Sequence, residues 1–282
     1  MDIVNKNNAL QDELAALVET IPGDVGLYAA RLDSDASVAI DATSQFPTAS
    51  SVKMFILFAA LNMADLHRIS LSERVEYDTR FSTPGSGVLT HLQPGLHLTV
   101  MDFATLMMMI SDNTATNILI DYLGLDAINE SLALIPLPDT RVGSWMDFKN
   151  SDRDSYSLGY STPAEMGSFL SAIRGGALLS ENSRERFWDT LRIQKYIEPL
   201  RRELPASPWA REWEHPEPVW VASKPGHLID CTTETGLVHA HGVEWVISVM
   251  TRSMPREDPE NDGERLISRA SRLVFDAWSP EC

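Results

Sequence analysis

Apolar side chains recur at helical spacing over residues 10–21, and a Pro-Gly pair ends that pattern. We therefore expect an amphipathic helix near the beginning of the chain. Two segments rich in apolar, β-branched and aromatic residues follow at 26–32 and 37–42, separated by a polar triplet at 33–35. This pattern predicts two short strands joined by a hairpin turn.

A mostly helical pattern with many turn-forming residues covers 46–170. The apolar run at 52–61 contains neither Gly nor Pro and is broken only by Lys53, so it predicts a helix buried on most of its faces. Another helix is expected at 115–123, where Gly follows the last periodic residue. Residues 136–160 have no clear periodicity, which indicates a long irregular loop of the kind that often carries function.

The last third of the chain returns to strand-forming patterns and ends in a helix. The expected strands cover residues 219–223, 235–240 and 243–251. Because strands occur near both ends of the chain, we expect 1–45 and 165–282 to form one discontinuous α/β domain, with 46–164 inserted as a helical domain. The predicted fold class is therefore α/β, an antiparallel sheet flanked by helices with an inserted all-α domain.

The composition indicates a globular protein and disfavours several classes of partner. Of 282 residues 44% are apolar, which allows a large core, and the formal net charge of −17 disfavours nucleic acids and anionic membrane surfaces. The first residues lack a signal-peptide pattern, and no segment approaches the roughly 20 apolar residues of a membrane span. We therefore expect a cytoplasmic protein with a small-molecule substrate; the sequence leaves the oligomeric state open.

The cysteines and histidines predict neither a disulfide framework nor a metal site. Cys231 and Cys282 lie in no metal-binding pattern, so free thiols are expected. His239 and His241 could ligate a metal from one face of a strand, but no third ligand is evident, and residues that flank a turn are the better interpretation. We expect no cofactor and no metal.

Lys53 enters the interior if the helix at 52–61 is buried, and Ser50 lies in the first turn of that helix. Residues three apart share a helix face, with Cβ atoms roughly 5 to 6 Å apart, so the serine hydroxyl and the lysine amine can form a hydrogen bond. Burial lowers the pKa of a lysine and provides a neutral amine that can accept the serine proton. The alternative is a lysine whose amine reaches the surface. The helix N-terminus favours an oxyanion beside Ser50.

Two further motifs follow in the order in which a known family carries them. The three motifs are Ser50-x-x-Lys53, Ser111-Asp112-Asn113 and Lys224-Pro225-Gly226. They resemble those of the active-site-serine, penicillin-recognising superfamily, and within it the class A β-lactamases. Smaller similarities involve Phe46, Pro94-Gly95, Thr99, Asp102, Thr114-Ala115, Asn117, Thr162-Pro163 and Met166. The resemblance implies a β-lactamase/transpeptidase-like fold with the active site between the two domains.

The resemblance also implies a role for each motif residue. Ser50 is the nucleophile and Lys53 accepts its proton. Ser111 passes a proton towards the leaving nitrogen, with Lys224 close by as a second cation that helps to keep Lys53 neutral. The backbone N–H groups of Ser50 and His227 form the oxyanion hole, where one donor is typically worth about 2.7 to 4 kcal/mol. The residues expected to contact the substrate are Asn113, Asp147, Asn150, Pro225, Gly226 and His227.

Met146 marks the main departure from the family. It lies where the family's β-lactamases carry the glutamate that activates the deacylating water, and methionine cannot accept a proton. Asp147 is next in the chain, but adjacent loop residues usually point in different directions. Pro225 replaces a threonine whose hydroxyl binds the β-lactam carboxylate. Glu234 falls near the position of an arginine that many members use for the same carboxylate, and its charge should repel that group.

The leading hypothesis is a serine hydrolase of the class A β-lactamase fold that forms an acyl-enzyme from an amide, ester or lactam and has weak or absent β-lactam turnover. A true class A β-lactamase is an alternative that Met146 and Pro225 disfavour. A third hypothesis is a penicillin-binding or metabolite-sensing protein that is acylated without turnover. The rates of adduct formation and decay distinguish these three hypotheses.

Overall fold

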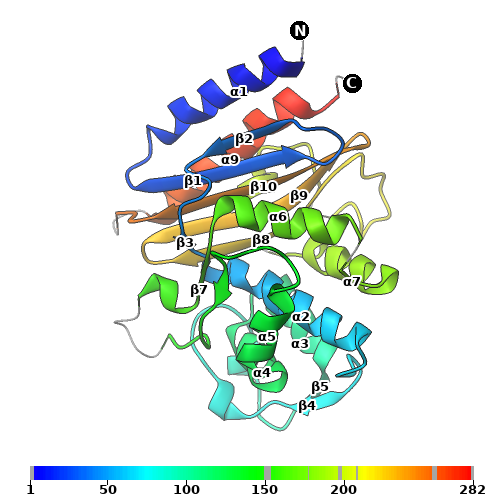
Figure 1. Ribbon diagram of the computed structural model, residues 1–282. Helices are drawn as coiled ribbons and strands as arrows, with labels where there is room; N and C mark the ends of the chain where they lie inside the picture. The colour runs from blue at the N-terminus through cyan, green and yellow to red at the C-terminus, as the bar shows by residue number, and fades with distance from the viewer. Residues whose placement is uncertain are drawn as a thin grey trace.

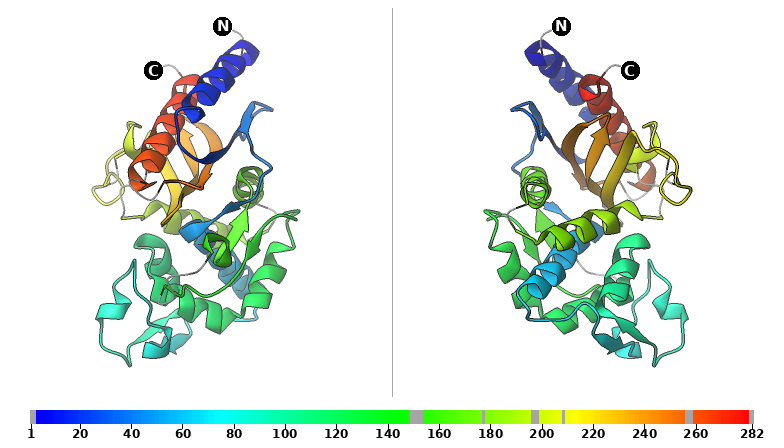
Figure 2. Two further views of the ribbon diagram at one scale, coloured as in Figure 1. Left: turned by 90° about the vertical axis from the view of Figure 1, so that its left-hand side faces the viewer. Right: turned by 90° about the vertical axis from the view of Figure 1, so that its right-hand side faces the viewer.

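The computed structural model describes residues 3–148, 154–176, 178–195, 199–207, 209–255 and 259–280. As drawn in Figure 1, an α/β part lies above a mainly helical part. In the α/β part, α1 (Ile3–Val18) and α9 (Pro259–Trp278) lie side by side on one face of a sheet, and α6 (Pro163–Arg174) covers the opposite face. The first and last helices therefore share one layer, as the side views in Figure 2 also show.

Among the described residues, the main sheet has five antiparallel strands in the order β2-β1-β10-β9-β8. They are β1 (Asp24–Arg31), β2 (Ser37–Ile40), β8 (Val219–Leu228), β9 (Cys231–Ala240) and β10 (Val243–Arg252). The predicted fold class is confirmed, although β8 and β9 are longer than the sequence pattern indicated. Pro225 is tolerated within β8 because β8 is an edge strand, where a missing N–H can face away from the ladder.

The side chains of β8 and β9 alternate between two cores. On one face, Val221 and Val238 pack in the core that α1 and α9 cover. On the other face, Ala222 and Leu237 belong to the larger core that continues into the helical part. Lys224 lies two residues after Ala222 along β8 and so shares its face. The sheet therefore presents the Lys224 side chain towards the helical part.

The helical part is built around α2, whose side chains are almost all buried. Its longer helices are α2 (Lys53–Asp65), α3 (Val100–Met109), α4 (Asn113–Leu123), α5 (Leu125–Leu132) and α7 (Glu181–Arg192). Phe55 and Phe58 of α2 pack edge to face against Phe169 of α6, with ring centroids 4.8 and 5.6 Å apart. The prediction of a buried helix is confirmed, and α2 contacts the helix that covers the sheet.

Residues 46–164 are mainly helical, as expected, and also contain short strands that the sequence pattern did not predict. The structure has β3 (Phe46–Pro47), β6 (Arg141–Val142) and β7 (Gly159–Ser161) in one small sheet, and β4 (Arg74–Glu76) paired with β5 (His97–Thr99). Strands of two or three residues are too short to show an alternating pattern. The boundaries of the two domains remain a prediction. No helix in the described ranges has both the length and the apolar content needed to cross a bilayer.

Candidate active site

Ser50 lies in the turn that leads into α2, directly against β8. A short 3₁₀ turn (Ala49–Val52) precedes the helix, and Ala49 adopts a left-handed conformation with φ of 44°. Such strain in a residue with a Cβ is typical of functional sites. A Cβ at Gly226 of β8 would lie 2.6 Å from the Ser50 nitrogen. The missing side chain at Gly226 therefore allows the third motif to approach Ser50.

Ser51 and Thr233 connect this turn to the sheet through buried hydroxyl groups. Ser51 Oγ donates to the Lys224 carbonyl oxygen at 2.9 Å and lies 2.9 Å from Thr233 Oγ1. Thr233 Oγ1 donates to the Thr48 carbonyl oxygen at 3.1 Å. Sequence reasoning missed both residues, because an isolated serine or threonine gives no signal that it will be buried between two elements. These bonds fix the turn that contains Ser50 relative to β8 and β9.

The Lys53 side chain is fully buried and reaches the second motif. Its Nζ donates to the Ser111 carbonyl oxygen at 2.7 Å and to Asn113 Oδ1 at 2.7 Å, and it lies 2.9 Å from Ser111 Oγ, a hydroxyl that can donate to the lone pair of a neutral amine. Burial lowers the pKa of Lys53 well below its usual value, and the charge of Lys224 lowers it further. The described side chains show no hydrogen bond between Lys53 Nζ and Ser50 Oγ. The direct bond expected from the sequence is thus replaced by bonds to the second motif.

Ser111, Asp112 and Asn113 form the junction between α3 and α4, so a capping role and a functional role coincide in this motif. The Asp112 carboxylate is buried and accepts three backbone N–H bonds of 2.7 to 2.9 Å, one of them as the N-cap of α4. Ser111 has a strained left-handed backbone with φ of 53°. The buried cap therefore holds the backbone from which Ser111 and Asn113 reach Lys53.

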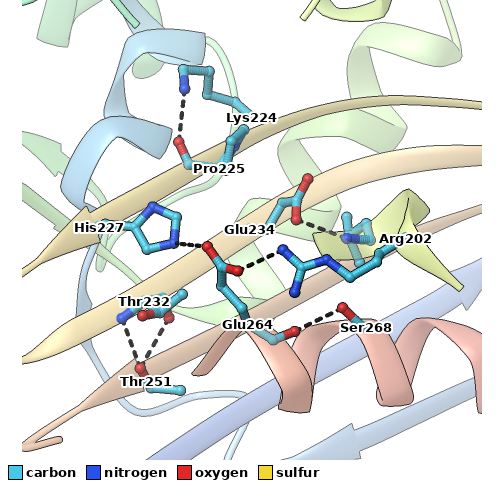
Figure 3. A network of polar contacts seen from close by, with 10 residues as sticks. Arg202, Lys224, Pro225, His227, Thr232, Glu234, Thr251, Glu264 and Ser268 are labelled. Atoms are coloured by element: carbon cyan, nitrogen blue, oxygen red, sulfur yellow. Dashed lines mark hydrogen bonds and ion pairs between the residues drawn. The ribbon is translucent and has the colours of Figure 1, made fainter. Parts of the chain in front are cut away.

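A cavity of about 580 Å³ opens beside Ser50 and touches all three motifs. It is lined by Ser50, Ser86, Ser111, Lys195, Arg202, Lys224, Pro225, Gly226, His227 and Glu264. The lining residues that sequence reasoning missed are Ser86, Lys195, Arg202 and Glu264. Lys224 is fully buried, and its Nζ donates to the Pro225 carbonyl oxygen at 2.7 Å (Figure 3). The structure thus brings Ser50, the second motif and the third motif to one cavity.

Met146 lies in the protein core and its backbone is held by Asn117. Met146 N donates to Asn117 Oδ1 at 2.7 Å, and Asn117 Nδ2 donates to the Met146 carbonyl oxygen at 3.1 Å. Asp147 is partly buried and is not among the described residues that line the cavity. Asn150 lies outside the described residues. The described part of this segment therefore brings no carboxylate to the cavity that contains Ser50.

Glu234 is directed away from the catalytic face of the sheet, so the expectation that it repels a substrate carboxylate is wrong. It pairs with Pro225 in the ladder, whereas Lys224 pairs with the next residue of β9, and neighbouring residues of a strand face opposite sides. The Glu234 carboxylate is fully buried and accepts bonds from Ser223 Oγ at 2.7 Å and Leu200 N at 2.9 Å. Burial raises the pKa of Glu234 to about 7.

Comparisons with known proteins agree with this geometry. The model of the beta-lactamase enzyme family matches residues 9–278. The imipenem-hydrolyzing beta-lactamase of Enterobacter cloacae is 27% identical over 274 residues, which are 94% of this chain and 88% of that protein. A solved beta-lactamase from Sphaerobacter thermophilus has a TM-score of 0.83 at 27% identity and covers 95% of this chain and 96% of its own. A mutant of PBP-A, solved as an acyl-enzyme complex with penicillin G, has a TM-score of 0.82 at 29% identity and covers 96% of each chain.

Proposed function

The chain belongs to the beta-lactamase enzyme family and is a serine hydrolase, and from this premise we propose that Ser50 is acylated with Lys53 as its base. The observation that carries the proposal is the buried Lys53 amine, whose pKa is lowered and which is bonded to Ser111 beside the cavity that Ser50 lines. A neutral amine near the hydroxyl supplies the base that an ordinary serine lacks. The proposed substrate is a small molecule that contains an amide, ester or lactam.

In the proposed acylation step, Ser50 Oγ attacks the carbonyl carbon of the substrate while its proton passes to the Lys53 amine. Catalytic hydrogen bonds often shorten when the substrate binds, so the missing direct bond between these two groups does not exclude the transfer. The tetrahedral intermediate carries its negative charge on the former carbonyl oxygen. We assign its stabilisation to the backbone N–H groups of Ser50 and His227.

The intermediate then collapses as the bond between carbon and the leaving nitrogen or oxygen breaks. The leaving group needs a proton, and Ser111 Oγ, which lies 2.9 Å from Lys53 Nζ, can deliver it while the amine resupplies Ser111. The products of this half-reaction are acyl-Ser50 and the free amine or alcohol. Lys224 favours this cycle because its charge helps to keep the Lys53 amine neutral between turnovers.

Substrate contacts are assigned to residues that line the cavity or adjoin it. Asn113 Nδ2 donates to the Pro84 carbonyl oxygen at 3.2 Å, and Asn113 Oδ1 accepts from Lys53, so its amide is held in one orientation. Pro225, Gly226 and His227 line the same cavity as Ser111 of the second motif. The substrate contacts of Asp147 and Asn150 remain predictions from the resemblance.

Deacylation is the step for which the described residues include no evident base. Met146 occupies the position at which the resemblance places the water-activating glutamate, and a thioether cannot take a proton from water. We therefore propose that the enzyme turns β-lactams over weakly or not at all. The same feature favours a second candidate function, a penicillin-binding or metabolite-sensing protein that keeps its acyl group.

The test is to follow the covalent adduct with benzylpenicillin by intact-mass spectrometry. We expect one adduct of the mass of the intact antibiotic, located on Ser50, and we expect it to persist for many times the period of its formation. Rapid decay to free enzyme and penicilloate would support a true β-lactamase instead. Absence of any adduct with β-lactams and with activated esters would reject acylation of Ser50.

A further inference from the structure

The Glu264 carboxylate lies in the cavity and joins two other lining residues. Arg202 Nη2 donates to Glu264 Oε2 at 2.5 Å, and His227 Nε2 lies 3.3 Å from Glu264 Oε1. Figure 3 shows Glu264 reaching from α9 to the strand that carries His227, with Arg202 on its other side. The three side chains are about one quarter to one third exposed, so a bound substrate can contact them. One wall of the cavity therefore already contains a carboxylate bound to a guanidinium.

The other cations that line the cavity are also engaged. Lys195 forms an ion pair with Glu212 and lies 4.6 Å from the centre of the Trp209 ring. Lys224 is fully buried and donates to a backbone carbonyl oxygen. Glu264 is the one acid among the described lining residues. Its charge is therefore the only negative one that a substrate group would meet among the described residues that line the cavity.

We propose that Glu264 is a specificity-determining residue that makes the cavity select substrates without a carboxylate at the end that lies beside Arg202. This inference rests on the proposed function, because it concerns the substrate of the Ser50 site. The preferred substrate is an acyl compound whose group beside Arg202 is a neutral ester, amide or alcohol, or an amine.

The physical reason is competition for Arg202. An incoming carboxylate must either displace Glu264 from the guanidinium or lie beside it, and both arrangements place like charges together. A neutral group can instead accept a hydrogen bond from the guanidinium N–H groups that Glu264 does not use. An ammonium group can pair with Glu264 itself. Pro225 has no N–H or hydroxyl with which to offset the repulsion.

The same contacts allow an opposite interpretation, in which Glu264 orients Arg202 so that the guanidinium can bind a substrate carboxylate. The two interpretations predict opposite signs for the loss of the Glu264 charge. Under our proposal, Glu264→Gln improves the binding of an anionic ligand relative to its neutral ester. Under the opposite interpretation, the same substitution weakens it.

Equilibrium binding to protein carrying Ser50→Ala separates this proposal from acylation. Two proteins are compared, Ser50→Ala alone and Ser50→Ala with Glu264→Gln. Calorimetric titration of each with benzylpenicillin and with its methyl ester gives the ratio of the affinity for the acid to the affinity for the ester. We expect the ester to bind more tightly when Glu264 is present, and we expect Glu264→Gln to shift the ratio towards the acid by about tenfold or more. Because no covalent step is involved, failure of Ser50 to react does not affect this result.

Glu203→Gln is the matched control. Glu203 adjoins Arg202 in the chain and is an exposed acid 3.9 Å from Arg269, and it does not line the cavity. We expect the affinity ratio of this variant to equal that of the Ser50→Ala protein. The proposal would be overturned if the two Gln variants shifted the affinity ratio equally, or if Glu264→Gln left the ratio unchanged or reversed its direction. It would also be overturned if neither ligand bound measurably to any variant. Acylation of Ser50 in the otherwise unchanged enzyme tests the proposed function separately.

Discussion

Lys53 and Ser111 are joined twice: the amine of Lys53 donates to the carbonyl oxygen of Ser111 at 2.7 Å and lies within hydrogen-bond distance of its hydroxyl, at 2.9 Å. The first bond anchors the amine to the strained backbone between α3 and α4, and the second connects it to a hydroxyl that can carry a proton. A third bond, to Asn113, completes the environment of the amine. The base therefore belongs structurally to the second motif as much as to the first.

Lys53→Met is expected to reduce the rate of Ser50 acylation by about 10²- to 10⁴-fold, the usual contribution of a general base. Methionine keeps most of the buried volume but cannot accept a proton. The measurement is the rate of adduct formation with benzylpenicillin by intact-mass spectrometry, with circular dichroism to establish that the variant is folded. Acylation at an unchanged rate in a folded variant would mean that another group is the base.

The acylation rate of the unmodified enzyme is expected to rise with pH and to level off well below pH 10.5, the ordinary pKa of lysine, because the pKa of Lys53 is lowered. Only the neutral amine accepts the serine proton, so the rate follows the deprotonated fraction. Lys224→Met removes a nearby positive charge and should move the midpoint of the profile to higher pH. Lys195→Met, which alters another cavity lysine, should leave the midpoint in place. A midpoint unaffected by Lys224→Met would contradict the coupling.

Met146→Glu is expected to accelerate decay of the acyl-enzyme by about 10²-fold or more, since it supplies a general base at the position that the family uses. The unpaired buried carboxyl should also lower the melting temperature. Single-turnover decay of the benzylpenicillin adduct measures the effect. Met146→Gln has a similar shape without a proton acceptor and should decay like the unmodified enzyme. Equal decay in the Glu and Gln variants would show that the deacylating base must come from elsewhere.

Gly226→Ala is expected to slow acylation by about 10²-fold or more, because displacement of reacting groups by 1 Å can have an effect of this size. The new Cβ would lie 2.6 Å from the Ser50 nitrogen and 2.9 Å from the Ser51 nitrogen, so β8 and the turn must separate. Gly175→Ala is the control, since its Cβ would meet its nearest neighbour at 3.4 Å. Normal acylation by Gly226→Ala would argue against close contact between β8 and Ser50.

The buried carboxyl of Glu234 predicts a specific dependence of stability on pH. Its pKa is about 7 in the folded protein against 4.5 for an ordinary glutamate, so the folded state holds the proton more tightly. The stabilisation of the folded state by this proton is fully present below pH 4.5 and is lost as the pH rises to about 7. This loss lowers the free energy of unfolding by at most about 3 kcal/mol. Glu234→Gln should remove this loss. Urea unfolding of both proteins across this pH range tests it, and a stability difference independent of pH would contradict it.

The three motifs could be predicted from the sequence because each combines unusual residues within a short segment. Lys53 stands out in an apolar run, and the structure buries it as expected. Thr99 and Asp102 have the spacing of a capping box, which is visible in the sequence alone, and they form this reciprocal box at the start of α3. Such local signals depend on neighbours in the chain and need no knowledge of the tertiary structure.

Other features of the site depend on contacts between distant segments. Arg202 and Glu264 are 62 residues apart in the chain and meet because the short helix α8 (Pro199–Arg202) packs against α9. Neither residue differs in sequence from an ordinary surface charge. The direction of the Glu234 side chain depends on the register of β8 and β9. Pro225 interrupts the strand-forming pattern of β8, so the sequence did not indicate how far the ladder between these strands extends. Pairing between strands cannot be deduced from the pattern of one strand alone.

Asn117 holds Met146 through two hydrogen bonds, and both involve the peptide groups of Met146 rather than its thioether. These two hydrogen bonds consequently do not depend on which side chain occupies position 146. During divergence of such enzymes, selection can therefore change the lifetime of the covalent intermediate without altering how readily it forms. Under the proposed role of position 146, a durable receptor for a reactive metabolite and a fast catalyst would share one scaffold and differ by the exchange of a single side chain.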